Sequence, residues 1–107
     1  MNAPANTPPA ENQVIDALKT VFDPEIPVNV YDLGLIYDIQ IQGDGRVEIT
    51  MTLTNPNCPV ADEMPARVAV AVKNLDGVKE TDIRLVFDPP WTKEKMSEAA
   101  MLELGLL

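Results

Sequence analysis

The chain has 107 residues, of which 46% are hydrophobic, and it carries a formal net charge of −9 with one cysteine and no histidine. This length fits one small domain, and the acidic excess argues against binding to nucleic acid or to an anionic membrane surface, because both need a basic face. A single cysteine excludes an internal disulfide, and the lack of histidine excludes a histidine-based metal site or general base. We therefore expect a protein of a reducing compartment, the cytoplasm.

The first ten residues are rich in Pro, Ala and Asn, and they lack the basic and apolar regions of a signal peptide. No stretch of the chain approaches the ~18 apolar residues that a membrane span needs. We expect residues 1–10 to form a flexible tail and residues 11–107 to form a single domain.

A helix is predicted over residues 8–22, because apolar residues recur there at helical spacing. Asn6 or Thr7 can cap this helix, Pro8 suits its first turn, and Pro24 ends it. The apolar positions are Val14, Ile15, Leu18, Val21 and Phe22.

Two alternating segments follow, and they predict a β-hairpin with one covered face. The turn between them contains Gly43 and Gly45, which we expect to supply positive φ angles. The apolar positions are Leu35, Tyr37, Ile39 and Ile41 in the first segment, and Val47, Ile49, Met51 and Leu53 in the second. The alternate polar residues should face solvent; these are Asp38, Gln40, Gln42, Glu48, Thr50, Thr52 and Thr54.

The second half of the chain predicts a helix, a strand and a last helix. The first of these helices should begin near Asp62, hold Pro65 in its first turn and stop at Gly77. Residues 78–87 alternate as a strand, and Ser97 and Gly105 mark the two ends of the last helix. The apolar face of this strand holds Ile83, Leu85 and Phe87.

The order of these elements is helix, strand, strand, helix, strand, helix. Each strand has one apolar face and each helix has one apolar stripe. A two-layer α+β fold, with helices on one face of a three-stranded mixed sheet, buries all of them.

Cys58 lies in the segment NPNCP, between two prolines and just before the second helix. The simplest interpretation is a small buried hydrophobe, which most free cysteines are. Three features favour a functional thiol instead: the loop is polar, it leads into a helix start that favours a thiolate, and Pro59 fixes the local path of the backbone. Because Asp62 and Glu63 disfavour a free thiolate nearby, a ligand of a soft metal suits Cys58 better than a reactive nucleophile.

Other residues carry two interpretations each. Asp23, Glu25 and Asp32 either include a general acid–base pair or hold turns through their side chains. Trp91, in the segment DPPW, either plugs the edge of the core or forms part of a docking surface.

The strand order brings these segments together. If the second and third strands are parallel, the segments NPNCP and DPPW leave the sheet at the same end, and the segment DPEIP feeds the first strand at that end. We expect a functional face there, with Cys58 at its centre and with Glu25, Asp32 and Trp91 around it.

Three segments, DPEIPVNVYDLGLIYDI, MTLTNPNCP and DPPWTKEKMSEAAMLELGL, resemble in order and spacing the small iron–sulfur assembly family, which includes SufT-type maturation factors and PaaD-like proteins. The resemblance covers residues 11–107. It places the family's cysteine on Cys58, its DPE motif on residues 23–25, its DLG motif on residues 32–34 and its PPW motif on residues 89–91; Thr54 also fits the pattern. The chain stops without the cysteine-rich extension of PaaD-like members, which favours the SufT-like branch.

This resemblance implies a non-enzymatic role in the maturation of iron–sulfur proteins, with Cys58 as a ligand of iron or of a cluster. Because clusters usually take about four cysteine ligands, a second copy, a client or a small thiol would complete the set. The implied partners are iron–sulfur scaffold or carrier proteins and apo client proteins, and a homodimer is one arrangement. Two other hypotheses stay open: an adaptor whose Cys58 is structural, and a thiol enzyme with Asp23 or Glu25 as base.

Overall fold

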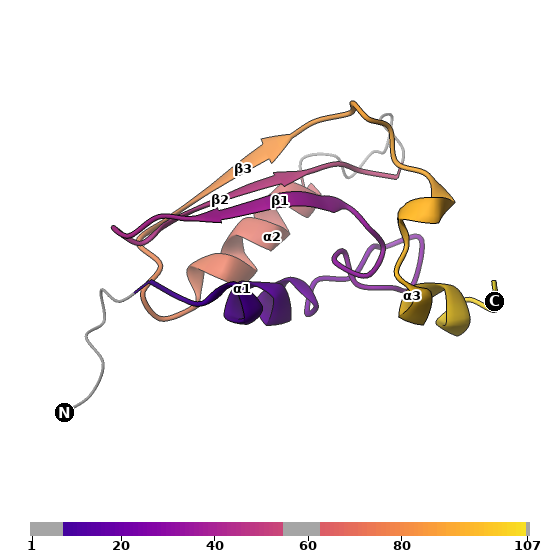
Figure 1. Ribbon diagram of the computed structural model, residues 1–107, viewed down its shortest axis with the longest axis horizontal. Coiled ribbons are helices and arrows are strands. Elements are labelled where there is room, and N and C mark those ends of the chain that lie inside the picture. Colours follow the sequence, from indigo (N-terminus) through magenta and orange to yellow (C-terminus); the bar gives the residue numbers. More distant parts are fainter. Residues whose placement is uncertain (1–7, 55–62, 107) are drawn as a thin grey trace.

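The computed structural model describes residues 8–54 and 63–106, and it has the predicted α+β fold (Figure 1). The elements are α1 (Glu11–Leu18), β1 (Ile36–Ile41), β2 (Arg46–Met51), α2 (Glu63–Lys73), β3 (Glu80–Leu85), a short 3₁₀ helix η1 (Lys93–Lys95) and α3 (Glu98–Glu103). The predicted order is confirmed, and η1 is an element that the pattern did not indicate. Within the described ranges, no helix has the length and apolar character needed to cross a bilayer.

β2 is the central strand of a mixed sheet with the order β1-β2-β3. β1 pairs antiparallel with β2, so that Ile39 lies opposite Ile49, and β3 runs parallel to β2 with Ile83 opposite the same residue. In Figure 1, α1 and α2 lie on one side of the sheet, while α3 lies beyond one end of it. Among the residues that the structure describes, no helix covers the opposite face of the sheet, which we call its open face.

The core fills the space between the sheet and the helices. Along β2, buried and less buried residues alternate, as a pleated strand with one covered face requires. Its inner residues belong to one buried cluster with the helix stripes; the cluster members on these elements are Val47, Ile49 and Met51 on β2, Val14 and Leu18 on α1, and Met64, Val68 and Val72 on α2.

The start of α1 differs from the prediction. The helix begins at Glu11, so Pro8 lies before it and not in its first turn. Its cap is Ala10, whose backbone N–H donates to Oε1 of Gln13 at 2.7 Å, and the caps predicted at residues 6 and 7 are therefore wrong. Gln13 can serve here because a glutamine at the third helical position reaches back to the cap.

The end of α1 comes earlier than residue 22. After Leu18 the backbone N–H groups of Thr20 and Val21 bond at three-residue spacing, to Ala17 and Leu18, which tightens the last turn. Phe22 then pairs with Asn29 in an isolated bridge. This bridge replaces the last predicted helical turn.

The other helices follow the sequence signals more closely. Pro65 lies in the first turn of α2, and Gly77 follows the helix with a φ of 88°. The side chain of Ser97 caps α3 by accepting from the N–H of Ala100 at 3.1 Å, and Gly105 follows with a φ of 74°. Asp62, the predicted cap of α2, lies outside the described residues.

The sequence prediction is wrong at the ends of β2 and β3 and at one glycine of the hairpin turn. Thr52, expected to face solvent, is fully buried. It lies just past the end of β2 at Met51, and its N–H donates to the Leu35 carbonyl at 2.8 Å. Phe87 lies past the end of β3 and is 43% exposed. In the hairpin turn only Gly45 has a positive φ, at 96°, and Gly43 does not.

Candidate functional site

Three strand ends meet at one end of the sheet. Met51, the last residue of β2, pairs with Ile36 at the start of β1 and with Leu85 at the end of β3. β2 and β3 are parallel, which is the condition under which the sequence brings these segments together. The segments that follow Met51 and Leu85 and the segment that precedes Ile36 therefore all join the sheet at this end, which we call the functional end.

A partly buried hydrogen bond ties the PPW motif to the DLG motif. The indole Nε1–H of Trp91 donates to the carbonyl oxygen of Leu33 at 2.7 Å, across 58 positions in the sequence. Trp91 is half-buried and packs against the core. It therefore closes the edge of the core, which is one of the two interpretations offered for it, and its role in a docking surface stays a prediction.

Asp32 stabilises the loop that contains the DLG motif. Its Oδ2 accepts from the side-chain amide of Asn29 at 2.9 Å, and its backbone N–H donates to Oδ1 of the same residue at 2.9 Å. The Asp32 carbonyl accepts from the N–H of Ser97 at 2.8 Å, which joins the loop to the start of α3. These contacts match the turn role that was one of the two interpretations of Asp32.

Gly34 allows the loop before β1 and the 3₁₀ helix η1 to approach each other closely. Its φ is 86°, and a Cβ added there would overlap the carbonyl group of Lys95. Only glycine takes this conformation without strain, and η1 packs directly on the backbone as a result.

Asp23 stabilises its own turn by accepting hydrogen bonds from backbone N–H groups. Its Oδ1 accepts from the N–H groups of Glu25 and Ile26, at 2.8 and 3.0 Å, and the residue is buried. Glu25 is exposed. Next to this turn, Nη1 of Arg67 donates to the carbonyl of Phe22 at 3.3 Å, which links the DPE loop to the first half of α2.

The segment that carries Cys58 begins after Thr54 and ends before Glu63. Thr54 is half-buried, two residues beyond the buried Thr52. Cys58 itself lies outside the described residues, and its expected place at the centre of the functional face stays a prediction. Among the described residues, no group of three or more Cys, Asp or Glu side chains is arranged to hold a metal ion.

Tyr37 belongs to the functional end, although the alternation placed it in the core. The pairing of β1 shifts between Ile36 and Asp38, so Ile36 packs against the core in place of Tyr37. The Tyr37 hydroxyl donates to the carbonyl of Pro89 at 2.8 Å, and Nζ of Lys95 lies 5.1 Å from the ring centroid. No local pattern in the sequence indicates this bulge.

The environment of Tyr37 changes its acidity. Burial raises the pKa of the phenol, the negative charge of Asp88 raises it further, and the nearby Thr52 hydroxyl lowers it in part. The side chain also lines an open hollow of about 560 Å³ at this end, together with Tyr31, Gly34, Ile36, Pro89, Lys95 and Ser97.

Comparisons with known proteins identify the family of the chain. Residues 11–85 match the sequence model of the family described as iron–sulfur cluster assembly protein. The chain is 56% identical over 97 residues to the Fe-S protein maturation auxiliary factor of Porphyromonas gingivalis, covering 91% of this chain and 92% of that protein. It is 42% identical over 96 residues to the Fe-S protein maturation auxiliary factor YitW of Bacillus subtilis, covering 90% of this chain and 94% of that protein.

A solved structure shares the fold. The crystal structure of a DUF59 domain from Bacillus anthracis superposes with a TM-score of 0.84 at 37% identity, covering 91% of this chain and 92% of that one. The resemblance seen in the sequence motifs is thus confirmed at the level of the family. The chain belongs to the iron–sulfur cluster assembly protein family.

Proposed function

We propose that this protein is a non-enzymatic, cytoplasmic maturation factor that carries iron or an iron–sulfur cluster, as cargo, to apo client proteins. Membership of the family and the names of the related proteins support this role. The observation that carries the proposal is the junction of the DLG and PPW motifs at the functional end, through the bond from Trp91 to Leu33. The segment with Cys58 leaves β2 at that same end.

Cys58 is the residue that would contact the cargo. Thiolates are the usual ligands of iron–sulfur clusters, and the chain has one cysteine and no histidine. One thiolate cannot hold a cluster alone, so the donor set fits cargo that is shared with another chain and passed on. It does not fit a resident cluster.

The hydrogen bonds of Asp23 and Asp32 indicate that these two carboxylates have a structural role. The two backbone N–H groups that donate hydrogen bonds to Asp23 belong to its own turn. The Asp32 carboxylate accepts a hydrogen bond from Asn29 in its own loop. A carboxylate that holds a turn in this way is poorly placed to act as a general base. We therefore favour a maturation factor over a thiol enzyme, and we assign these residues to keeping the loops around Cys58 in position.

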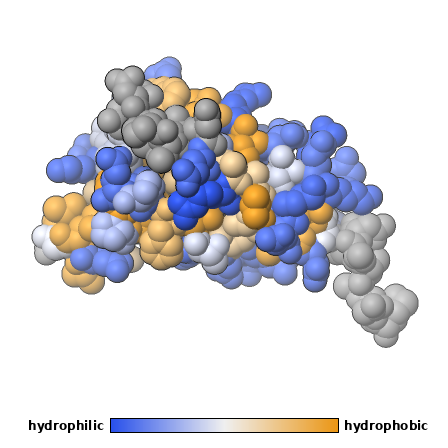
Figure 2. Space-filling view, turned by 180° about the vertical axis from the view of Figure 1, so that it is seen from behind, coloured by the Kyte–Doolittle hydropathy of each residue, from blue (hydrophilic) through white to orange (hydrophobic). Residues whose placement is uncertain are grey.

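Partners would dock on apolar surface near this end. Figure 2 shows apolar side chains reaching the surface at the end of the molecule that carries α3, where Leu102 is 66% and Leu106 is 50% exposed. Phe87, which follows β3, is also exposed. Exposed apolar groups next to stiff, proline-containing loops suit a docking surface, because little conformational entropy is lost on binding. The expected occupants are scaffold or carrier proteins and apo clients.

Substitution of Cys58 tests the proposal. Wild-type protein and the variant Cys58→Ser are incubated anaerobically with iron, sulfide and an apo client enzyme, and iron content, absorbance and client activity are measured. We expect the variant to melt at the wild-type temperature but to lose iron transfer and client activation. Client activation by Cys58→Ser at the wild-type level would instead support an adaptor, and a large fall in melting temperature would indicate a buried structural cysteine.

A further inference from the structure

The sheet has two edges, and the edge at β3 is regular. β1 carries a register shift between Ile36 and Asp38, and a bulge of this kind disfavours pairing with a further strand. β3 pairs with β2 along all 6 of its residues without a shift. Among the described residues, no strand pairs with its other side. β3 therefore presents a straight row of backbone groups at the edge.

One hydrogen bond indicates which of these groups point outward. The N–H of Val86 donates to the carbonyl of Met51 at 2.8 Å, so the backbone of Val86 points toward β2. Successive residues of a strand direct their N–H and C=O groups to opposite sides, so Asp82 and Arg84 also point toward β2. The residues whose backbone groups point to the free edge are Thr81, Ile83 and Leu85.

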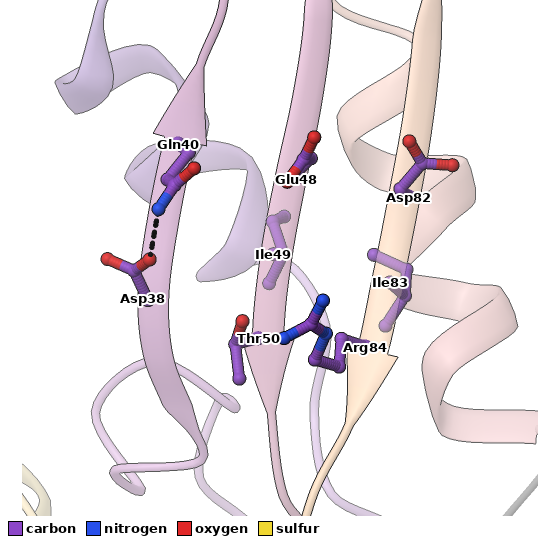
Figure 3. A pocket seen from close by; sticks show the side chains of 8 residues that line it. All are labelled: Asp38, Gln40, Glu48, Ile49, Thr50, Asp82, Ile83 and Arg84. Carbon is purple, nitrogen blue, oxygen red and sulfur yellow. Dashed lines mark hydrogen bonds between the residues drawn. The ribbon is translucent and has the colours of Figure 1, made fainter.

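The side chains of β3 carry a self-complementary charge pattern. Asp82 and Arg84 flank Ile83, are exposed, and project from the open face of the sheet (Figure 3). Arg84 forms no ion pair within residues 8–54 and 63–106, and Asp82 lies 4.0 Å from the guanidinium of Arg46. An antiparallel copy of β3 centred on Ile83 places Asp82 opposite the partner's Arg84, and Arg84 opposite the partner's Asp82.

We propose that two copies of this chain pair antiparallel through β3, with Ile83 on the two-fold axis, and join their sheets into one. In this register the outward-pointing residues face each other, so they can exchange backbone hydrogen bonds. Asp82 and Arg84 fall at non-hydrogen-bonded positions, where opposite side chains lie closest. A shift of the register by two residues in either direction brings two Asp82 or two Arg84 side chains together, which is unfavourable.

The groove beside β3 supports the same pairing. Val70 lies on the helix that packs against β3, yet it is 60% exposed. It lines an open groove with Ala69, Lys73, Asn74, Glu80 and Thr81. The two-fold axis brings the partner's α2 toward this groove, so that each copy covers the exposed valine of the other.

Pairing through β3 separates the two functional ends. Leu85 lies opposite the partner's Thr81, so the two Leu85 residues are about 13 Å apart along the sheet at ~3.3 Å per residue, and the chains diverge from there. If the proposed function is correct, this dimer leaves each functional end free, and a client or scaffold supplies the remaining cluster ligands. The dimer itself does not depend on that function.

Sedimentation equilibrium of the full chain tests the dimer. We expect wild-type protein to dimerise with increasing concentration at neutral pH. The variants Asp82→Arg and Arg84→Asp each turn two attractive cross-strand pairs into repulsive ones, and we expect each to weaken dimerisation by roughly tenfold or more. Mixed in equal amounts, the two variants are complementary and should form a heterodimer.

Two controls complete the experiment. Asp38→Arg makes the same charge change on β1 of the same open face, and it should leave the dimer intact. Cys58→Ser should also dimerise, which separates this inference from the proposed function. A wild-type protein that stays monomeric at every concentration, single variants that dimerise as the wild type does, or a mixture that stays monomeric would each overturn the proposal.

Discussion

At the scale of single residues, Tyr37 joins three parts of the functional end. Its hydroxyl bonds to Pro89 after β3, its ring lies under the ammonium group of Lys95 from η1, and its own strand is β1. Thr52 is buried beside it, at the point where the chain leaves β2. The phenol therefore connects β1 to the two segments that follow β2 and β3.

Alkaline pH should destabilise the fold through Tyr37. Burial raises the pKa of this phenol in the folded state. Above about pH 10 the unfolded chain therefore loses the phenol proton before the folded protein does. The contribution of Tyr37 to the free energy of unfolding is complete below pH 10 and is lost as the pH rises through the folded pKa. We expect urea denaturation to show that the difference in unfolding free energy between wild type and Tyr37→Phe is constant below pH 10 and shrinks above it. The variant should lose about 1 kcal/mol below pH 10, for the bond to Pro89.

An absorbance titration of tyrosinate gives an independent check. The difference between the wild-type and variant curves isolates Tyr37, and its midpoint should lie above the ordinary value near 10. A difference in stability that does not change with pH, or a midpoint at the ordinary value, would contradict the assigned environment.

At the scale of elements, the loop before β1 depends on Gly34. The variant Gly34→Ala should lose at least about 2 kcal/mol of stability, because alanine is strained at a φ of 86° and its Cβ would overlap the Lys95 carbonyl. Gly43→Ala is the matched control, because its added Cβ meets open space and its φ is not positive. Replacing glycine at such a position is neutral or slightly stabilising. Urea denaturation that gives both variants equal stability would show that η1 moves away without cost.

The elements themselves were predictable where burial is periodic. The alternation along β2 and the stripes of α1 and α2 reflect one covered face, and such a pattern is written in the local sequence. The boundaries were less predictable, because long-range contacts decide them. α1 ends early where Phe22 pairs with Asn29, and β1 carries a bulge that brings Ile36 and not Tyr37 into the core.

At the scale of the whole molecule, the site was predictable only as a set of segments. Strand directions place the DLG and PPW motifs at one end, and the sequence order alone indicates this. The bond from Trp91 to Leu33 spans 58 positions, and no local periodicity marks such a contact. Tyr37 and Lys95 were missed for the same reason, since their roles exist only after η1 folds onto the loop that contains Gly34.

The boundary between tail and domain, drawn at residue 10 from the sequence, stays a prediction, and truncation can test it. Deleting residues 1–6 should change the free energy of unfolding by no more than about 0.5 kcal/mol, the range of neutral surface changes. Deleting residues 1–10 should cost more, because Pro9 is buried and the carbonyl of Ala10 accepts from the N–H groups of Gln13 and Val14 at the start of α1. An unsatisfied first turn costs about 1 kcal/mol. Both proteins are compared with the full chain by urea denaturation, and equal stability of the two truncated forms would show that α1 needs nothing before Glu11.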